Sequence, residues 1–157
     1  MIAGATLAPG AAEGAPLRLD EPLSFWGGLD PATGVIIDRW HPQAGANVSG
    51  RVLLMPGGRG SSSGSAALAE ALRLGAGPAA ILLLRRDAIV IVGALVAAEL
   101  YGASCPVALV EDFAALEGAS RVQVQAGGKR AKIWATAWPP CSAPDGKTRA
   151  PPSDDAG

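Results

Sequence analysis

The sequence of 157 residues predicts one α/β domain, in which a β-rich layer is flanked by helices, followed by a short tail. Apolar residues make up 49% of the chain but aromatic residues only 4%, so small aliphatic side chains must build a closely packed core. Strand-like and helix-like segments alternate between Val48 and Val110, which favours parallel strands joined by right-handed crossovers. Further short strand patterns lie on both sides of this alternating region.

The N-terminal part is expected to contribute short strands. Three apolar runs bounded by Gly or Pro predict strands at residues 2–7, 16–20 and 35–38. The Gly-, Ala- and Pro-rich stretch 8–15 would connect the first two. Residues 24–34 form a rigid, glycine-rich segment that ends in a turn, because Pro31 presets φ and Gly34 tolerates a positive φ.

The alternating region predicts six successive elements. These are a strand at 48–55, a loop at 57–65, a helix at 66–74, a strand at 79–84, a helix at 88–101 and a strand at 106–110. Leu68 and Leu72 are four residues apart and would share one helix face. The β-branched run Ile89–Val92 leaves a strand as the alternative there.

The C-terminal part divides into a hairpin and a tail. Residues 122–125 and 133–137 flank Gly127-Gly128 and predict a final β-hairpin. After Trp138 the chain is rich in proline and has no apolar pattern. We therefore expect a folded domain over residues 1–138 and a disordered tail over 139–157.

Several function classes are not expected from this composition. The formal net charge is −1, and the local cluster Lys129, Arg130 and Lys132 is typical of a solvated turn, so no nucleic-acid partner is expected. Cys105 and Cys141 have neither metal-ligand spacing nor nearby histidines, so no metal site is expected in this chain. They form no disulfide framework, which fits the cytoplasm.

No membrane partner is expected either. The most apolar stretch, residues 88–100, is interrupted by Gly93 and Glu99 and is shorter than the ~20 residues of a spanning helix. The N-terminus lacks the charged and apolar regions of a signal peptide.

The segment Gly58-Arg59-Gly60-Ser61-Ser62-Ser63-Gly64-Ser65 is the main candidate site. Its glycines allow backbone N–H groups to turn inward, and the following helix adds partial positive charge, so the loop can hold an anion. By itself such a loop is more often a connector or a helix cap. It is not a Walker loop, since no Lys-Ser/Thr pair follows its last glycine, and Gly60–Gly64 is one residue too long for a nucleophile elbow.

A serine in this loop can alternatively act as a base in its alkoxide form. That role requires several N–H donors and a nearby positive charge, because the free hydroxyl is a very weak acid. A Gly/Ser turn at a helix N-terminus beside Arg59 would supply such surroundings.

Five ordered motifs together resemble the small swivelling subunit of the aconitase X family. They are Ser24-Phe25-Trp26-Gly27-Gly28, Asp30-Pro31 with Thr33-Gly34, His41-Pro42, Gly58–Ser65 and Gly77-Pro78-Ala79-Ala80, within a match from about Ala3 to Val110. The resemblance implies an aconitase-like swivelling domain, an α/β fold with a β-barrel or sandwich layer flanked by helices. It further implies a hydro-lyase that is active only with an aconitase-like large subunit, which carries the iron or iron–sulfur cluster.

The resemblance also implies roles for residues of the serine loop. Ser61 matches the serine that takes the substrate proton, and Arg59, Gly60, Ser62 and Ser63 would contact a small carboxylate substrate. Ordinary aconitases have an arginine directly after the two serines, where this chain has Ser63 and then Gly64. The carboxylate contact must therefore come from elsewhere, from Arg59 or from the partner.

The resemblance implies two substrates. The Ala-, Gly-, Arg- and Pro-rich composition is typical of a GC-rich bacterial genome. This favours cis-3-hydroxy-L-proline, dehydrated toward pyrroline-2-carboxylate, over 5-phosphomevalonate of the archaeal mevalonate pathway. The alternative outside catalysis is an anion-binding module. Phe25 and Trp26 would line a subunit interface, the active-site mouth or the core, Asp30 is expected in a turn, and His41 is expected at the surface or an interface.

Overall fold

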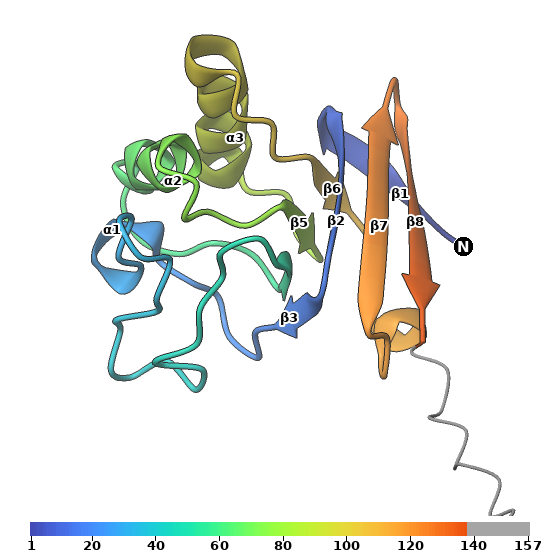
Figure 1. Cartoon of the computed structure of the whole chain (residues 1–157), viewed down its shortest axis with the longest axis horizontal. Coiled ribbons are helices and arrows are strands. Elements are labelled where there is room, and N and C mark those ends of the chain that lie inside the picture. Colours follow the sequence, from blue (N-terminus) through green and yellow to red (C-terminus); the bar gives the residue numbers. More distant parts are fainter. Residues whose placement is uncertain (138–157) are drawn as a thin grey trace, which may run out of the picture.

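The computed structural model describes residues 1–137, so the expected tail at 139–157 lies outside the described residues. The strands are β1 (Ile2–Ala8), β2 (Gly10–Gly14), β3 (Pro16–Arg18), β4 (Val52–Met55), β5 (Ala80–Leu83), β6 (Val107–Leu109), β7 (Arg121–Gly127) and β8 (Arg130–Thr136). The helices are α1 (Phe25–Gly28), α2 (Gly64–Arg73), α3 (Ala88–Tyr101) and the 3-10 turn η1 (Ala114–Leu116). Figure 1 shows α1, α2 and α3 together on one side of the strands and the β7–β8 hairpin on the other.

The eight strands formed by the described residues make one curled sheet in the order β2-β7-β8-β1-β6-β5-β4-β3. Strands β3 to β6 are parallel neighbours, while the other pairs are antiparallel. The two edge strands, β2 and β3, are separated in sequence only by Ala15. A sheet whose opposite edges are joined by one residue must curl until those edges approach, which makes a nearly closed barrel.

The parallel strands β4 and β5 are buried on both faces, as their continuous apolar runs predict. In β4 and β5, Leu53 and Ile81 pack toward the helices, and Leu54 and Leu82 point into the barrel. The domain therefore has two apolar cores on either side of one sheet wall. The inner core also receives Phe113 of the segment leading to η1.

Helices α2 and α3 pack directly against each other. Gly93 makes this close approach possible, because a Cβ atom at this position would lie 2.8 Å from the Ser65 carbonyl oxygen and 3.1 Å from Leu68 Cβ. The helix expected at 88–101 is confirmed, and its strand alternative is wrong. Asp87 caps its first turn by accepting the Ile89 and Val90 N–H groups.

Two expectations for the N-terminal part are wrong. The presumed connection 8–15 contains β2, whose small residues pair in register with distant β7. The strand expected at 35–38 is absent from the described structure, where Val35 and Ile36 form only isolated bridges to Asn47 and Leu29.

The start of β4 and the position of the hairpin turn also differ from expectation. Strand β4 begins at Val52 rather than Val48, because Arg51 N–H bonds back to the Val48 carbonyl in a turn. The hairpin turn lies at Gly128-Lys129, one residue later than expected, since Gly128 adopts the positive φ of +58° and Gly127 still belongs to β7.

Candidate functional site

The serine loop connects the carboxyl end of β4 to the N-terminus of α2. In sheets with parallel strands, ligands commonly bind beyond these carboxyl ends. Ser61, Ser62 and Ser63 are all exposed there, so the three residues are accessible to a ligand. Its backbone is internally bonded: Gly64 N–H donates to the Ser61 carbonyl at 3.0 Å.

The Ser61 hydroxyl lies at the start of α2. Its Oγ accepts a hydrogen bond from the Ser63 N–H group at 3.0 Å. A backbone donor at a helix N-terminus favours negative charge on the accepting oxygen. Of the several N–H donors that the alkoxide role requires, the described residues supply this one to Ser61 Oγ.

Arg59 is held on two sides. Its backbone N–H donates to the Leu23 carbonyl at 3.2 Å, and its guanidinium forms an ion pair with Asp38. The Trp40 N–H and Arg59 hold the pKa of the Asp38 carboxyl below its usual range. Arg59 remains partly exposed, with 42% of its side-chain surface accessible. It can therefore offer its remaining N–H donors to an anion while Asp38 fixes its position.

Gly60 allows the loop to turn tightly over Ser24. Its φ is +96°, and a Cβ atom there would lie 2.6 Å from Ser24 Oγ. Ser24 Oγ is itself occupied by a hydrogen bond of 2.8 Å to the Trp26 carbonyl. Gly60 thus has a conformational role in the loop, in addition to the substrate contact expected from sequence.

Two expected roles outside the loop have clear outcomes. Asp30 is a turn residue as expected, since its carboxylate accepts from Ala32 N–H and Thr33 Oγ1. His41 is buried with 3% exposure, so the expected surface position is wrong. Its Nδ1 accepts from Gln43 N–H, which leaves Nε2 to donate to the Glu21 carbonyl, so the ring ties two loops together.

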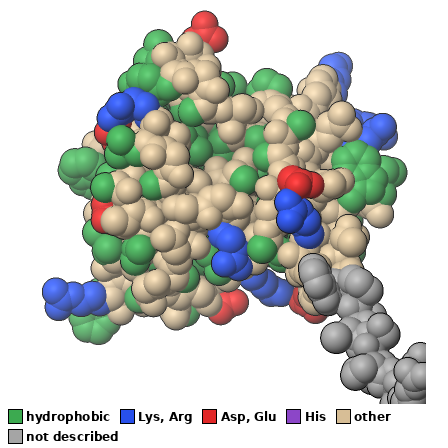
Figure 2. Space-filling view, in the orientation of Figure 1, with side chains coloured by type: hydrophobic (Ala, Val, Ile, Leu, Met, Phe, Trp, Pro, Cys, Tyr) green, Lys and Arg blue, Asp and Glu red, His purple; other side chains and the backbone are tan. Residues whose placement is uncertain are grey.

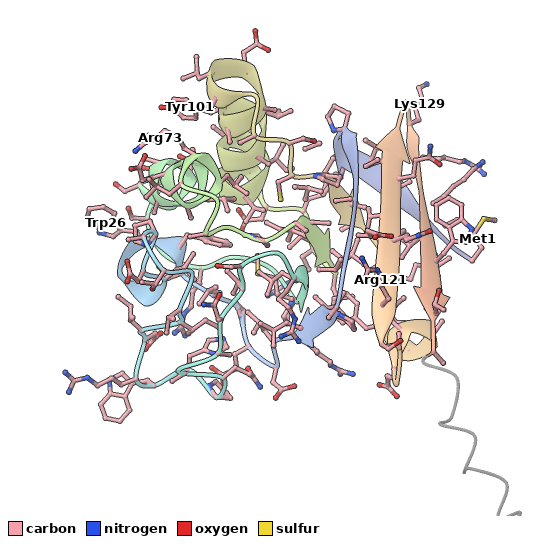
Figure 3. All side chains as sticks on the ribbon, in the orientation of Figure 1. Met1, Trp26, Arg73, Tyr101, Arg121 and Lys129 are labelled. Atoms are coloured by element: carbon pink, nitrogen blue, oxygen red, sulfur yellow. The ribbon has the colours of Figure 1, made fainter. Side chains whose placement is uncertain are left out.

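An apolar hollow of about 520 Å³ lies beside the serine loop. Its lining comes from α1, the following segment and α2, and includes Trp26, Pro31, Ile37 and Ala66. Phe25, which also lines the hollow, is buried, whereas Trp26 is 62% exposed and Ile37 is 51% exposed. Figure 3 shows Trp26 projecting outward at α1, and Figure 2 shows hydrophobic side chains on this side of the molecule.

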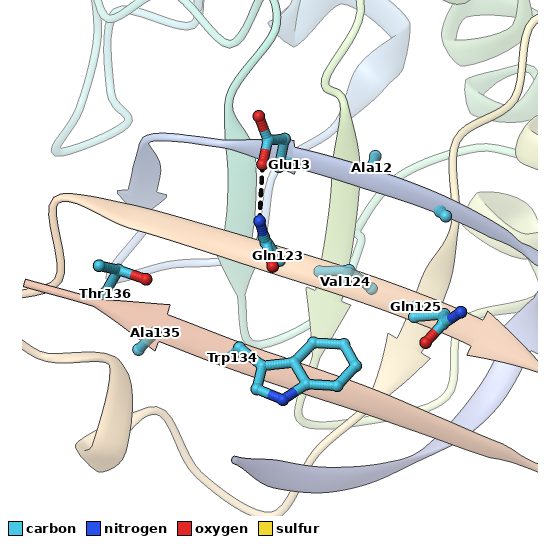
Figure 4. A pocket seen from close by; sticks show the side chains of 9 residues that line it. Ala12, Glu13, Gln123, Val124, Gln125, Trp134, Ala135 and Thr136 are labelled. Carbon is cyan, nitrogen blue, oxygen red and sulfur yellow. Dashed lines mark hydrogen bonds between the residues drawn. The ribbon is translucent and has the colours of Figure 1, made fainter.

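A second hollow, of about 690 Å³, lies across β2, β7 and β8 (Figure 4). Its polar side chains bond to one another: Glu13 accepts from Gln123 at 2.8 Å and pairs with Arg121, which lowers its pKa. None of its lining residues is a serine, cysteine or histidine. The chemistry expected from sequence therefore concentrates at the serine loop.

Neither a metal centre nor a membrane span is found within residues 1–137. No group of three or more His, Cys, Asp or Glu side chains there is arranged to hold a metal ion. No helix in this part is both long and apolar enough to cross a membrane. Cys105 is fully buried, which raises the pKa of its thiol to about 12 and makes it a poor nucleophile. Cys141 lies outside the described residues.

Residues 1–133 match the family model of the aconitase X swivel domain. The chain belongs to this family. The swivel domain is 49% identical over 108 residues to cis-3-hydroxy-L-proline dehydratase of Pseudomonas aeruginosa, a match that covers 69% of this chain and 19% of the relative. It is 42% identical over 126 residues to cis-3-hydroxy-L-proline dehydratase of Hypocrea jecorina, covering 79% and 21%. The chain thus spans about one fifth of the length of these two relatives.

Other relatives are separate small proteins. The swivel domain is 34% identical over 132 residues to the phosphomevalonate dehydratase small subunit of Pyrococcus furiosus, covering 84% of this chain and 92% of that protein. The crystal structure of Thermococcus kodakaraensis aconitase X in its holo-form superposes with a TM-score of 0.70 at 30% identity, covering 83% and 95% of the two chains. The expected α/β swivelling fold is therefore confirmed, and the relatives from Pseudomonas aeruginosa, Hypocrea jecorina and Pyrococcus furiosus are named as dehydratases or a dehydratase subunit.

Asp87 holds the serine loop of the swivel domain, and the sequence alone does not indicate this contact. Asp87 directly precedes the helix expected at 88–101, and its Oδ2 accepts the Gly58 N–H at 3.0 Å. The order Asp87-Ala88 at the start of an apolar helix signals a cap. No local signal indicates the bond to Gly58, because the two residues are 29 positions apart.

Proposed function

We propose that this swivel domain is the small subunit of an aconitase X-type dehydratase, with Ser61 as the proton acceptor. The observation that carries this proposal is the exposed Ser61 hydroxyl, which accepts the Ser63 N–H at the start of α2. Family membership and the dehydratase relatives support the reaction class.

The reaction would remove a proton from the carbon next to a carboxylate. Ser61, as an alkoxide, would take that proton, the C–H electrons would form a C=C bond, and the neighbouring C–O bond would break to release hydroxide. The Ser63 N–H would stabilise the alkoxide before the transfer. Arg59, fixed by Asp38, would orient the substrate carboxylate, with Gly60, Ser62 and Ser63 lining the same face.

The iron or iron–sulfur cluster expected for the family does not fit a site in residues 1–137 of this chain. No suitable group of ligands is present there, and the buried Cys105 thiol holds its proton. We therefore assign the cluster to the large subunit, and the role of this chain is proton transfer and substrate positioning.

We infer that cis-3-hydroxy-L-proline is the substrate, with 5-phosphomevalonate as the alternative. The identity of 49% to the Pseudomonas aeruginosa enzyme supports this choice, against 44% to the phosphomevalonate dehydratase small subunit of Methanothermobacter thermautotrophicus. The charge beside Ser61 points the same way, because Asp38 compensates Arg59. A substrate with one carboxylate and one ammonium group needs less cationic surface than one with a carboxylate and a phosphate.

The partner is inferred to cover the serine loop and the adjoining apolar hollow. Exposed Trp26 and Ile37 lie beside the loop, and large exposed aromatic groups are typical of interface anchors. A large subunit placed there would enclose Ser61 and exclude water from its hydroxyl.

The test is dehydration of cis-3-hydroxy-L-proline by this chain co-purified with an aconitase-like large subunit. Ser61→Ala is expected to lower kcat at least about a thousandfold, a loss of the size reported for key catalytic groups, while leaving complex formation and iron content intact. Ser120→Ala is the matched control, since its hydroxyl lies at the start of β7 and bonds the Thr136 carbonyl. An active Ser61→Ala complex would refute the role of Ser61. If the complex turned over 5-phosphomevalonate but not cis-3-hydroxy-L-proline, the substrate would be 5-phosphomevalonate. If this chain bound an anion without any partner, a non-catalytic binding module would be favoured.

A further inference from the structure

We propose that Asp87 is the positioning residue that fixes the serine loop on the first turn of α3. This inference rests on the proposed function of Ser61. The two proposals differ because Asp87 neither reacts nor touches substrate. Asp87 instead holds the backbone of the loop that carries Ser61.

The Asp87 carboxylate joins two elements through three backbone N–H groups. Oδ1 accepts from Ile89 at 2.9 Å and from Val90 at 3.1 Å, which caps α3. Oδ2 accepts from Gly58 at 3.0 Å, at the first residue of the serine loop. An ordinary cap needs one acceptor oxygen, so the second oxygen is free to hold the loop.

The position held by Oδ2 requires glycine on the loop side. A Cβ atom at residue 58 would lie 2.7 Å from Asp87 Oδ2, closer than real contacts allow. The backbone of Gly58 therefore approaches the carboxylate directly, and a side chain there would push the two apart.

The other end of the loop rests on the same turn of α3. A Cβ atom at Gly64 would lie 3.1 Å from Ile89 Cγ2, and Gly64 is buried. Gly58, Gly64, Asp87 and Ile89 line one shared small cavity of about 10 Å³. Both ends of the loop are thus seated on α3, and Ser61 lies on the exposed bend between them.

This seating gives Asp87 a specific consequence for Ser61. Because Gly58 and Gly64 are fixed, the intervening turn can hold Ser61 Oγ against the Ser63 N–H. Losing the Gly58 bond frees the first residue of the loop, and the Ser61–Ser63 hydrogen bond should open more often. Preorganised donors stabilise charge only while they are held in place.

Asp87→Asn separates the loop bond from the helix cap. Asparagine has one acceptor oxygen, which can still cap α3, but its NH₂ group cannot accept from Gly58. Hydrogen exchange of individual amides in the full chain should show Gly58 and Ser63 exchanging about tenfold faster, the effect of one hydrogen bond, with Ile89 and Val90 protected. In the complex, kcat should fall about tenfold while KM and the melting temperature change little.

Asp112→Asn is the matched control, since Asp112 also bonds a nearby amide, that of Ala114, away from the loop. Its exchange pattern at Gly58 and Ser63 should equal that of the natural chain. Asp87→Ser is the second variant, because serine keeps a good cap and removes the second oxygen. It should reproduce the faster exchange at Gly58 and Ser63 even if Asp87→Asn folds poorly.

The exchange data separate this inference from the proposed function. Faster exchange at Gly58 with unchanged exchange at Ser63 would overturn the positioning role, whatever the enzyme does. Unchanged kcat in an active Asp87→Asn complex would overturn it as well. A natural complex that dehydrates nothing would refute the proposed function, while faster exchange at Ser63 would still support the role of Asp87 in holding the loop.

Discussion

Asp38 and Arg59 form an ion pair that links the segment after α1 to the serine loop. The carboxylate is used on both sides, since Oδ1 accepts the Trp40 N–H at 3.0 Å and Oδ2 contacts Arg59. Only 17% of the Asp38 side chain is exposed, whereas Arg59 is 42% exposed. The less exposed partner therefore positions the more exposed one.

Asp38→Asn should change substrate binding more than folding. The variant leaves the charge of Arg59 uncompensated, so a substrate with two anionic groups should gain relative to one with a single carboxylate. We expect the ratio of kcat/KM for 5-phosphomevalonate over cis-3-hydroxy-L-proline to rise several-fold, measured on the complex. Glu117→Gln is the control, because Glu117 pairs with Arg18 elsewhere on the surface. An unchanged ratio would contradict a role for this pair in selectivity.

The same pair predicts a direction of pH dependence. Hydrogen bonding from Trp40 N–H and contact with Arg59 lower the pKa of Asp38 in the folded state. Its contribution to stability is thus fully present above the ordinary pKa of about 3.9 and is lost as the pH falls through the lower folded value. Urea unfolding between neutral pH and about pH 3 should show the natural chain and Asp38→Asn converging at the acid end. A difference in the free energy of unfolding between the two chains that grew as the pH fell would contradict this prediction.

Gly93→Ala should destabilise the packing of α2 on α3. Alanine favours helix by up to about 1 kcal/mol over glycine, but here its methyl group would lie 2.8 Å from the Ser65 carbonyl oxygen. Overpacking of this kind costs about 1–3 kcal/mol, so we expect a net loss in the free energy of unfolding measured with urea. Val92→Ala, one residue away and 47% exposed, should change it by no more than about 0.5 kcal/mol. A stabilised Gly93→Ala chain would show that the helices can move apart at little cost.

Leu82→Ala should be costly because Leu82 fills the barrel interior and is fully buried. Removing a leucine side chain from such a site typically costs about 2–5 kcal/mol. Leu95→Ala on the outer face of α3, where leucine is 41% exposed, is the comparison and should cost much less. Equal losses in chemical denaturation would argue against a packed core inside the barrel.

Trp26→Ala tests the inferred partner surface without touching the serine loop. Trp26 is 62% exposed, so its loss should leave the melting temperature of the isolated chain nearly unchanged. A buried interface tryptophan often contributes 2 kcal/mol or more, so Kd for the large subunit should rise about tenfold or more in titration calorimetry. Trp40→Ala is the control, since Trp40 is 91% exposed and does not line the hollow. Equal changes in Kd for the two variants would show that the large subunit does not bind at the hollow beside Trp26.

The parts of the fold that sequence predicted best are those with strong local patterns. Strands β4, β5 and β6 are continuous apolar runs, and α2 and α3 lie between them in the chain. The existence and order of these elements therefore follow from the apolar runs and from the Gly and Pro residues that separate them. Strand β2 escaped prediction because Gly10–Gly14 has no strand propensity of its own and is held by pairing with β7. The β-branched segment Val35–Ile37 has strand propensity but forms only isolated bridges. It is not a strand because no neighbouring strand pairs with it along its length.

The candidate site shows the same division. The Gly/Ser composition of residues 58–65 and the position before a helix could be read directly from sequence. The ion pair of Arg59 with Asp38 and the bond from Gly58 to Asp87 connect residues 21 and 29 positions apart. Such long-range partners carry no local sequence signal, and only the folded chain brings them together.

The single residue between β2 and β3 has a consequence for the two open edges of the sheet. Exposed sheet edges present unpaired N–H and C=O groups that can recruit a strand of another molecule. Here the chain passes from one edge of the sheet to the other through Ala15, so the covalent backbone itself brings the two open edges together. A flexible insertion after Ala15 would let the seam open, and both edges would then be available as templates for aggregation.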